Sequence, residues 1–530
     1  MPWINCAVIF AWLVATAGAD TRYVSLEGGN HPPYTTWQDA ATQIQSAVDA
    51  ATVGDTVLIS NGTYLISTQI VVTNGITLRG LQGYSNTLIA ADWPTYTNRC
   101  IYVSGTSVID GLSFSNGHVI SSVTNDNGGG MWARGNPLIR NCWFGYNYCS
   151  NNTDSVNGYG GGGLWISNGV VSNCMFFNNV ATRGGAGISA YYNSGVKVFD
   201  SIIISNTVLT VGGISYGAGI WSSGAGSICL VSNSLVAYNS FSGSDTTYGG
   251  GCYVCRVVNS SIRNNSATQG GGIFRGIASN SIISFNNATY GGAASASVAI
   301  LSVDNCDIVG NTASQEGGGI RISVGGGSLQ RVRNCAISNN VSVRGAGVYC
   351  ENGGVILNCL INNNTNSSTT GYGAGAYLQN FSSGTLTGSL ENCTIVNNYS
   401  ANDCGGVLSS GATNLIYNCI IAGNRSFSNR YTDVFTGSTA AGTNCFYNCL
   451  VGTNRLLLNP DQGNIYGDPK FKDPTGDYRL ASDSACVNAG TNRSWATNAL
   501  DLAGSIRIRY GMVDIGAYEI LYQGLLFQAR

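Results

Sequence analysis

Aromatic residues recur at one position of a glycine-rich repeat, where they could stack against sugar rings. Each repeat is a Gly/Ala-rich triplet followed by an apolar residue, and the next residue should face outward if the segment is a strand. Of eleven such positions, seven are aromatic: Trp132, Trp165, Trp221, Tyr253, Phe274, Tyr349 and Tyr377. Rings along one surface suit an extended glycan. The alternative is that they pack on one another or under long loops and add only stability.

Acidic residues in the loops before the triplets are the candidates for catalysis. Asp126 and Asp154 enter consecutive triplets, and Arg183 enters the next one. Two carboxylates and an arginine beside Trp132 and Trp165 could bind Ca²⁺ and a uronate, or act as acid and base in glycoside hydrolysis. The alternative is that they are solvated loop residues. The pattern requires no cofactor, and Ca²⁺ is expected only for a lyase.

The composition excludes several classes of function. Twenty-four basic and 26 acidic residues give the 530-residue chain a formal net charge of −2, so it lacks the basic field that nucleic-acid binding needs. His31 and His118 are the only histidines, which argues against His-dependent triads and most zinc sites. The 44% of hydrophobic residues are enough to form a large core.

A second repeat runs in step with the first and predicts the fold. The unit Asn-Cys/Ser-x-apolar-x-x-Asn has twelve copies, with starts 21 to 34 residues apart. They begin at Asn141, Asn173, Asp200, Asn233, Asn259, Asn280, Asn305, Asn334, Asn358, Asn392, Asn418 and Asn448. The second and fourth residues share a face, as in a strand, and 21 residues are too few for a pair of helices. The expected fold is all-β, a single-stranded right-handed parallel β-helix of stacked coils.

The second and last positions of this unit predict two internal ladders. Cysteine fills the second position in eight copies and serine in the other four, so the position calls for a small inward side chain. We expect free thiols there rather than disulfides. Every copy closes on Asn six residues after its start. We expect this Asn to adopt the left-handed backbone conformation and to hydrogen-bond its equivalents on neighbouring coils.

The start of the chain predicts export. Residues 6–15 are apolar and precede Ala17-Gly18-Ala19, so 1–19 is interpreted as a signal peptide, with a buried strand as the alternative. The protein would then be secreted or displayed at the cell surface. No later stretch approaches the length of a transmembrane segment.

Both ends of the rod should be capped. Residues 20–109 are expected to form an N-terminal cap and the first coils, with a helix over 36–51 that begins at Thr36. A helix lying over the first coil would shield its open edge. The repeats fill 110–454, and 455–530 should cover the other end.

Motifs at both ends and in the repeats resemble one group of proteins. The chain opens with Gly54-Asp55-Thr56-Val57 and Asn61-Gly62-Thr63-Tyr64, and closes with Asp477-Tyr478-Arg479-Leu480, Asn488-Ala489-Gly490 and Asp514-Ile515-Gly516-Ala517-Tyr518-Glu519. The chain resembles bacterial right-handed parallel β-helix surface proteins of the pectin-lyase-like fold. Its repeats are similar to those of polymorphic outer-membrane proteins, and its end looks like a choice-of-anchor Q region. The resemblance implies the fold and export, and the group includes polysaccharide lyases, hydrolases and adhesins.

Three hypotheses of function follow from the sequence. The first is a secreted or surface protein that binds polysaccharide or a cell-surface glycan, or mediates adhesion, through the aromatic stripe. The second is a polysaccharide lyase or glycoside hydrolase acting on a uronate-rich glycan. The third is a purely structural surface protein. The identity of the glycan and the oligomeric state stay open.

Overall fold

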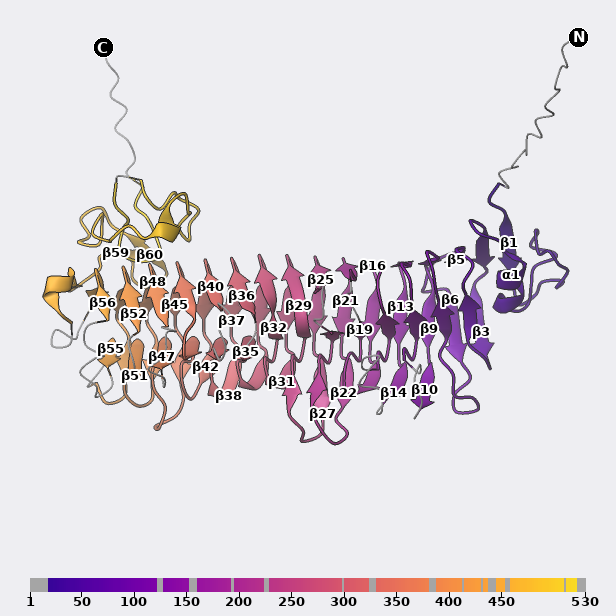
Figure 1. Ribbon diagram of the computed structural model, residues 1–530, viewed down its shortest axis with the longest axis horizontal. Helices are drawn as coiled ribbons and strands as arrows, with labels where there is room; N and C mark the ends of the chain where they lie inside the picture. The colour runs from indigo at the N-terminus through magenta and orange to yellow at the C-terminus, as the bar shows by residue number, and fades with distance from the viewer. Residues whose placement is uncertain are drawn as a thin grey trace, which may run out of the picture.

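The protein is a rod of stacked coils, shown as a computed structural model in Figure 1. The structure describes residues 18–121, 127–151, 160–191, 195–223, 228–297, 300–323, 330–380, 388–411, 414–429, 432–436, 445–452, 458–509 and 511–521. Most of the predicted signal peptide lies outside these ranges. Within them, the named strands pair in parallel from coil to coil, except for the antiparallel hairpin of β59 (Phe471–Asp473) and β60 (Asp477–Leu480).

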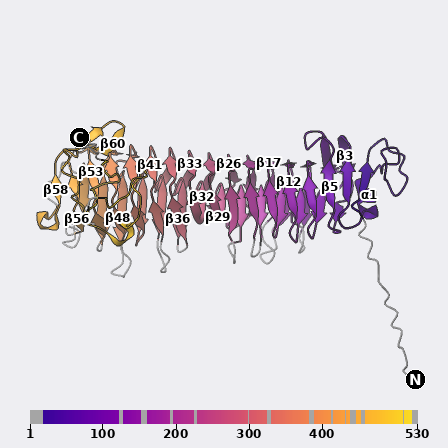
Figure 2. The ribbon, with the colours of Figure 1, turned by 90° about the horizontal axis from the view of Figure 1, so that it is seen from above.

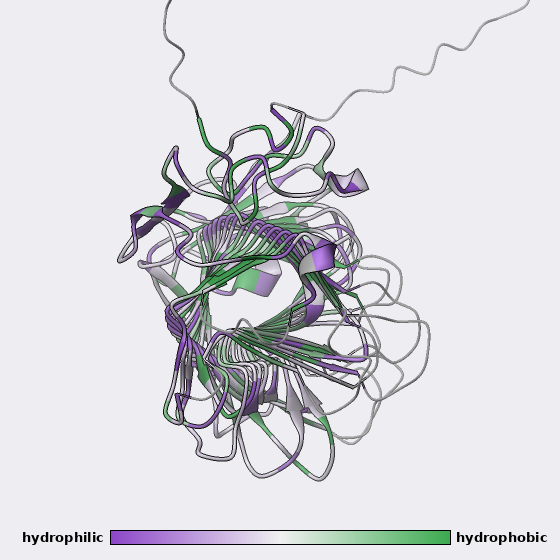
Figure 3. Cartoon of the chain, turned by 90° about the vertical axis from the view of Figure 1, so that its left-hand side faces the viewer, coloured by the Kyte–Doolittle hydropathy of each residue, from purple (hydrophilic) through white to green (hydrophobic). Residues whose placement is uncertain are grey.

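Each coil contributes strands to three faces of the rod. In one coil, β29 (Cys252–Val258) lies in a long sheet, here sheet A, β30 (Ser261–Arg263) in sheet B and β31 (Ser266–Gln269) in sheet D. In longer coils an insertion divides the sheet A strand into two. The two strands β24 (Ile220–Ser222) and β25 (Cys229–Ser232) therefore both pair with the single strand β29. Seen along the rod, the coils superpose on one another (Figure 3).

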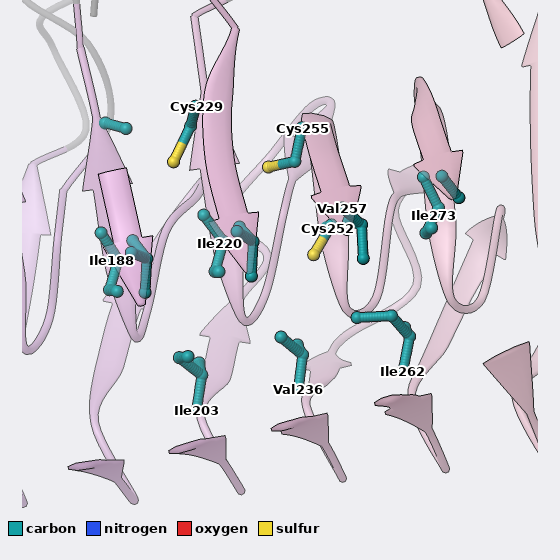
Figure 4. Packing of buried hydrophobic residues seen from close by; sticks show 14 of the residues in the cluster. Ile188, Ile203, Ile220, Cys229, Val236, Cys252, Cys255, Val257, Ile262 and Ile273 are labelled. Atoms are coloured by element: carbon teal, nitrogen blue, oxygen red, sulfur yellow. The ribbon is translucent and has the colours of Figure 1, made fainter. Parts of the chain in front are cut away.

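The core is the interior of the coils. Alternate residues of each strand point inward, so Ile188, Ile220, Cys252 and Ile273 from sheet A stack opposite Ile203, Val236 and Ile262 from sheet B (Figure 4). Each of these side chains is at most 1% exposed. Burying one isoleucine is worth about 1.5–3 kcal/mol, and each coil adds several such residues. The all-β solenoid predicted from the repeats is confirmed.

The closing asparagines form the predicted ladder inside the rod. From Asn147 to Asn424, each side-chain Nδ2 donates to the Oδ1 of the next closing Asn at 2.9–3.0 Å. Asp433 accepts the last of these bonds, from Asn424 at 3.0 Å. The predicted backbone conformation is wrong, however. The left-handed residues are the opening Asn or Asp of each unit, with φ of 49–54°, and the residue just before the closing Asn. These two residues make the corners of the coil, which leaves the closing Asn free to point inward.

The cysteine prediction is confirmed for the described part of the chain. All 17 cysteines there are buried, and none forms a disulfide. Those at the second position of the unit point inward, as the exchange with serine indicates.

A helix packs against the N-terminal end of the rod, but it is shorter than predicted. Helix α1 spans Ile44–Ala50 and lies beside β1 (Thr21–Val24) and β4 (Ile70–Val72) (Figures 1 and 2). Thr36 and Asp39 do hydrogen-bond each other, at 2.8 Å, yet they form a turn. The helix cannot begin there because Ala41 pairs with β1, its N–H donating to the Tyr23 carbonyl at 2.9 Å.

Residues 458–466 stack on the last coil, at the end that 455–530 is predicted to cover, and the rest of the C-terminal segment returns along the side of the rod. Strand β58 (Ile465–Tyr466) completes sheet B, and residues 468–509 and 511–521, here called the C-terminal lobe, then lie beside the last coils (Figures 1 and 2). Within the lobe, Leu480, Cys486 and Ile515 pack on Ile420 and Leu450 of sheet B. Three opening asparagines donate to lobe carbonyls at 2.8–3.1 Å: Asn358, Asn392 and Asn418.

Candidate functional site

The seven aromatic residues predicted from the triplets lie in one row on sheet A. Register pairs Trp132 with Trp165 on the next coil, and Tyr349 with Tyr377. The row includes Trp221, Tyr253 and Phe274 between them. The side chains point outward, as expected, because the residues on either side, such as Met131 and Ala133, belong to the core.

This row is covered, which corrects the expectation of an open stripe. Six of the seven side chains are buried, and Tyr253 is half-buried. Trp132 and Trp165 meet edge to face at 6.0 Å, and the Arg134 guanidinium lies 4.6 Å from the Trp132 ring centroid. Packing among rings and arginines was the alternative that the sequence left open. Ligand binding at this row stays a prediction.

The predicted acid pair cannot be placed. Asp126 and Asp154 lie outside the described residues. Arg183 is described: it is half-buried at the turn before β19 (Ile188–Ala190), with φ of 69°. Its Nε is buried and has no hydrogen-bond partner among the described residues. The catalytic role of these three residues therefore stays a prediction from the sequence.

Elsewhere on the rod, a carboxylate of sheet D, Glu316, and one of sheet A, Glu351, are both held by arginine. Arg321 lies between Glu316 and Glu351, at 3.1 and 3.0 Å. Arg344 binds the other oxygen of Glu316 at 3.3 Å. These ion pairs engage the carboxylate oxygens that a general acid or base would have to offer to a substrate. In the ranges that the structure describes, no three His, Cys, Asp or Glu side chains gather as a metal site requires.

The open aromatic surface is on sheet B. We call it the aromatic face: the outer side of sheet B and the following corner, from β13 (Trp143–Gly145) to β33 (Ile282–Ser284). Tyr146, Tyr238 and Phe285 stand on this corner and are 54%, 50% and 61% exposed. Several outward residues of the neighbouring strands are also apolar: Trp143, Met175, Phe177, Ile202, Leu235 and Ile282. The strand between the coils of Tyr238 and Phe285, β30, presents Ser261 and Arg263 instead.

The three exposed rings occupy a backbone conformation that costs stability. Tyr146, Tyr238 and Phe285 have φ of 59°, 55° and 54°. This left-handed conformation costs a residue with a Cβ about 1–2 kcal/mol, and only Gly, Asn and Asp adopt it routinely. Of the other described coils, one has Ser205 at the same position and seven have Asn or Gly: Asn178, Asn264, Gly310, Asn339, Asn363, Asn397 and Gly423. Exposed aromatic residues at strained positions are not explained by packing, and such strain is concentrated at functional sites.

Two rings of the aromatic face lie flat because glycine leaves room for them. A Cβ at Gly145 would collide with the Trp143 ring, and one at Gly310 would lie 2.6 Å from Phe285 Cε1. Tyr146 meets Phe177 edge to face at 5.6 Å, and the Arg263 guanidinium lies 5.7 Å from the Tyr238 ring centroid. Flat, exposed rings are suited to stacking on a sugar ring.

The C-terminal lobe covers the same side of sheet B at the other end of the rod. There the outward residues Thr394, Ile420 and Leu450 are at most 1% exposed. Glu391 fixes the position of the lobe, since it accepts hydrogen bonds from Arg493 Nε at 3.2 Å and Trp495 Nε1 at 2.7 Å. The aromatic face is thus the uncovered part of a surface that packs against protein elsewhere.

Comparison with known families agrees with this architecture. A family model described as "Right handed beta helix region" matches residues 247–421. The chain is a right-handed parallel β-helix. No curated protein matches the sequence significantly. In the described part of this β-helix, no helix is long and apolar enough to cross a bilayer.

Solved structures show only a distant likeness to this β-helix. The Dettilon tailspike protein is 16% identical, with 67% of each chain covered and a TM-score of 0.34. The PL6-family alginate lyase AlyGC is 12% identical, over 83% of this chain and 56% of that one, with a TM-score of 0.34. Pectate lyase Pel9A is 13% identical, over 95% and 97%, with a TM-score of 0.26. Likeness at this level does not identify a shared function.

Sequence reasoning missed the exposed rings of the β-helix although the signal was present. The residue before each closing Asn is Asn, Ser or Gly in eight described copies and aromatic in three. The sequence prediction gives the left-handed conformation to the closing Asn itself, and this hides the conflict between an aromatic side chain and the backbone conformation one residue earlier.

Proposed function

We propose that this protein binds an extended polysaccharide or cell-surface glycan on the aromatic face. The observation that carries the proposal is the exposure of Tyr146, Tyr238 and Phe285 at strained left-handed positions. Exposed rings at a cost in stability are expected where the rings serve a ligand. Exposed apolar patches on soluble proteins are typical of surfaces that bind a ligand or another macromolecule.

The geometry of the rod suits a polymer that runs along it. Coils are spaced by about 4.8 Å, so Tyr238 and Phe285, two coils apart, are separated by about 10 Å along the axis, roughly the length of a disaccharide. Tyr146 lies three coils before Tyr238. Several weak stacking contacts on one chain add up through multivalency. A rigid sheet also presents its rings without a cost of ordering them.

Export and surface display are part of the proposal. The apolar segment before Ala17-Gly18-Ala19 supports secretion, and an extracellular location would bring the aromatic face to glycans. The repeats that resemble those of polymorphic outer-membrane proteins, and the end that resembles a choice-of-anchor Q region, support display at a cell surface. Adhesion is the role that such display implies.

Affinity electrophoresis tests the proposal. The full chain is run in native gels that contain a panel of soluble polysaccharides, beside the triple variant Tyr146→Asn, Tyr238→Asn, Phe285→Asn. The matched control is Phe427→Asn, which removes a ring that is 77% exposed but lies outside the aromatic face. We expect at least one polymer to retard the wild type and the control but not the triple variant. Equal retardation of all three proteins would overturn the proposal.

A further inference from the structure

A polar cleft of about 360 Å³ lies on the face of the rod next to the aromatic face. Its lining includes Asp245, Thr247, Thr268, Thr289 and Ser314, together with Phe241. Among the described residues that line it, Asp245 is the one that carries a charge.

The cleft arises where a long coil meets short ones. The coil with β27 (Ser240–Ser242) and β28 (Thr247–Tyr248) inserts the loop 243–246 between these two strands. The next coil has no such loop, because β31 spans the same edge as one strand, followed by β34 (Asn287–Tyr290). The loop therefore stands as a wall, and β31 and β34 form the floor.

The floor presents the hydroxyl groups of Thr268 and Thr289 side by side. Ala288 points into the core, so its neighbour Thr289 faces outward, and the pairing of β31 with β34 places Thr268 beside it. On the wall side, Thr247 Oγ1 accepts from the Thr268 N–H at 2.7 Å and lies 3.1 Å from Thr268 Oγ1. These bonds hold the hydroxyls in place before any ligand binds.

Asp245 gives the cleft a fixed acceptor. Its Oδ2 accepts from the Gly213 N–H at 3.1 Å, which orients the carboxylate. A carboxylate can accept several hydrogen bonds, and bonds to a charged acceptor are about twice as strong as neutral ones. The hydroxyls of a sugar are suitable donors. A ligand carboxylate, by contrast, would meet a like charge here, with no cation among the lining residues to offset it.

The cleft adjoins the exposed rings. Asn287 lines the cleft two residues after Phe285, and Phe241 lines it three residues after Tyr238. Two residues of chain span at most about 7 Å, so a glycan stacked on Phe285 has the cleft within reach.

We propose that this cleft binds a sugar residue of a neutral glycan and selects neutral over uronate polymers. The inference rests on the proposed function and names the class of its ligand. The aromatic rings can stack on any sugar ring. Asp245 and the threonine hydroxyls would form hydrogen bonds with the sugar hydroxyls, and the charge of Asp245 would repel the carboxylate of an acidic sugar.

Titration with defined polymers tests the inference. The full chain is titrated with soluble β-1,3-glucan, galactomannan and xylan as neutral probes, and with alginate and polygalacturonate as uronates. Asp245→Asn keeps the shape and can still accept from Gly213, and Thr268→Val and Thr289→Val remove single hydroxyls. Thr312→Val, on the same face but outside the lining, is the control. Loss of one hydrogen bond to a charged group should weaken binding of a neutral probe by roughly tenfold or more.

The outcomes separate this inference from the proposed function. Weaker neutral binding in Asp245→Asn and the two valine variants, with Thr312→Val unchanged, supports it. If these variants bind neutral probes like the wild type while the Tyr146/Tyr238/Phe285 triple variant does not, the cleft inference fails and the proposed function stands. Tighter binding of alginate or polygalacturonate than of every neutral probe also overturns it. If the wild type binds none of the neutral probes, the cleft inference fails, and affinity electrophoresis decides the proposed function separately.

Discussion

The Phe285 ring lies against Gly310 of the next coil, where a Cβ would come within 2.6 Å of the ring atom Cε1. Both residues occupy the same position of the repeat, with φ of 54° and 68°. Phe285 thus places an exposed ring at this position in one coil, and Gly310, which has no side chain, leaves room for that ring in the next coil.

Replacing an exposed ring by asparagine should separate stability from binding. In Phe285→Asn the residue becomes one that tolerates the left-handed backbone, so the free energy of unfolding should stay the same or rise by about 1 kcal/mol. Glycan binding should fall. Urea unfolding and affinity electrophoresis measure the two effects. If the ring served only packing, the variant would instead be less stable.

A methyl group at Gly310 should disturb the site through the ring. Gly310→Ala and Gly423→Ala both place alanine at the same left-handed position, with φ of 68° and 69°, and both should lose about 1–2 kcal/mol of stability. Only Gly310→Ala also displaces Phe285, since the nearest atom at Gly423 is Asn397 Oδ1 at 3.4 Å. We expect weaker glycan binding in Gly310→Ala alone. Equal binding by the two variants would show that the position of the Phe285 ring does not matter.

The asparagine ladder should contribute strongly to stability. Asn265 donates Nδ2 to the Val236 carbonyl at 2.9 Å and to Asn286 Oδ1 at 3.0 Å, and it accepts from Asn239. Asn265→Ala leaves buried partners without hydrogen bonds, which should cost about 1–3 kcal/mol for each such group. The exposed Asn287→Ala on the next coil is the matched control, with an expected change within about 0.5 kcal/mol. Similar urea midpoints for the two variants would contradict this role.

The buried thiols should be unreactive in the folded protein. Burial raises the pKa of Cys100, Cys445 and Cys486 to about 12, so these thiols stay neutral at pH 8, and the thiolate is the reactive form. Mass spectrometry after treatment with iodoacetamide at pH 8 should find these cysteines unmodified in the native protein and modified in denaturant. Rapid native labelling would mean that the coils open or that these positions are not buried.

Attachment of the C-terminal lobe should weaken at alkaline pH. Burial raises the pKa of Glu519 to about 8, although Arg507 lies 3.1 Å away and opposes the shift. An unfolded glutamate has a pKa near 4.3, so its contribution to stability is complete below that pH and is lost as the pH rises through about 8. The protection of lobe amides from hydrogen exchange, taken relative to the base-catalysed rate of an unfolded chain at the same pH, should be lower at pH 9 than at pH 6. Glu519→Gln should reduce that difference, and an unchanged difference would point to another group.

The fold could be predicted because each coil repeats the same pattern of inward apolar residues and the same closing asparagine. Inward residues such as Ile203 and Val236 alternate with outward ones, and the closing asparagines need partners at a fixed spacing. The start of α1 could not be read in this way. The hydrogen bond between Thr36 and Asp39 is local, whereas the pairing of Ala41 with β1 depends on the tertiary structure.

The candidate site was only partly accessible to sequence reasoning. The row from Trp132 to Tyr377 was placed correctly on an outward position, but whether such a ring is covered depends on neighbours distant in sequence, such as Arg99 over Trp132. To predict the exposed rings, one has to know which residue of the repeat has the left-handed backbone conformation, and only the geometry of the coil shows this. The cleft beside Asp245 depends on the step between two coils of different length.

The central claim is that the aromatic face contacts a glycan, and hydroxyl-radical footprinting measures this directly. The full chain is oxidised with and without the polymer that retards it most in affinity gels, and modified residues are identified by mass spectrometry. The account predicts that the polymer protects Tyr146, Tyr238 and Phe285 from oxidation and leaves Phe427 unchanged. Unchanged oxidation of these three rings, with protection on sheet A beside Trp132 and Trp165 instead, would contradict it.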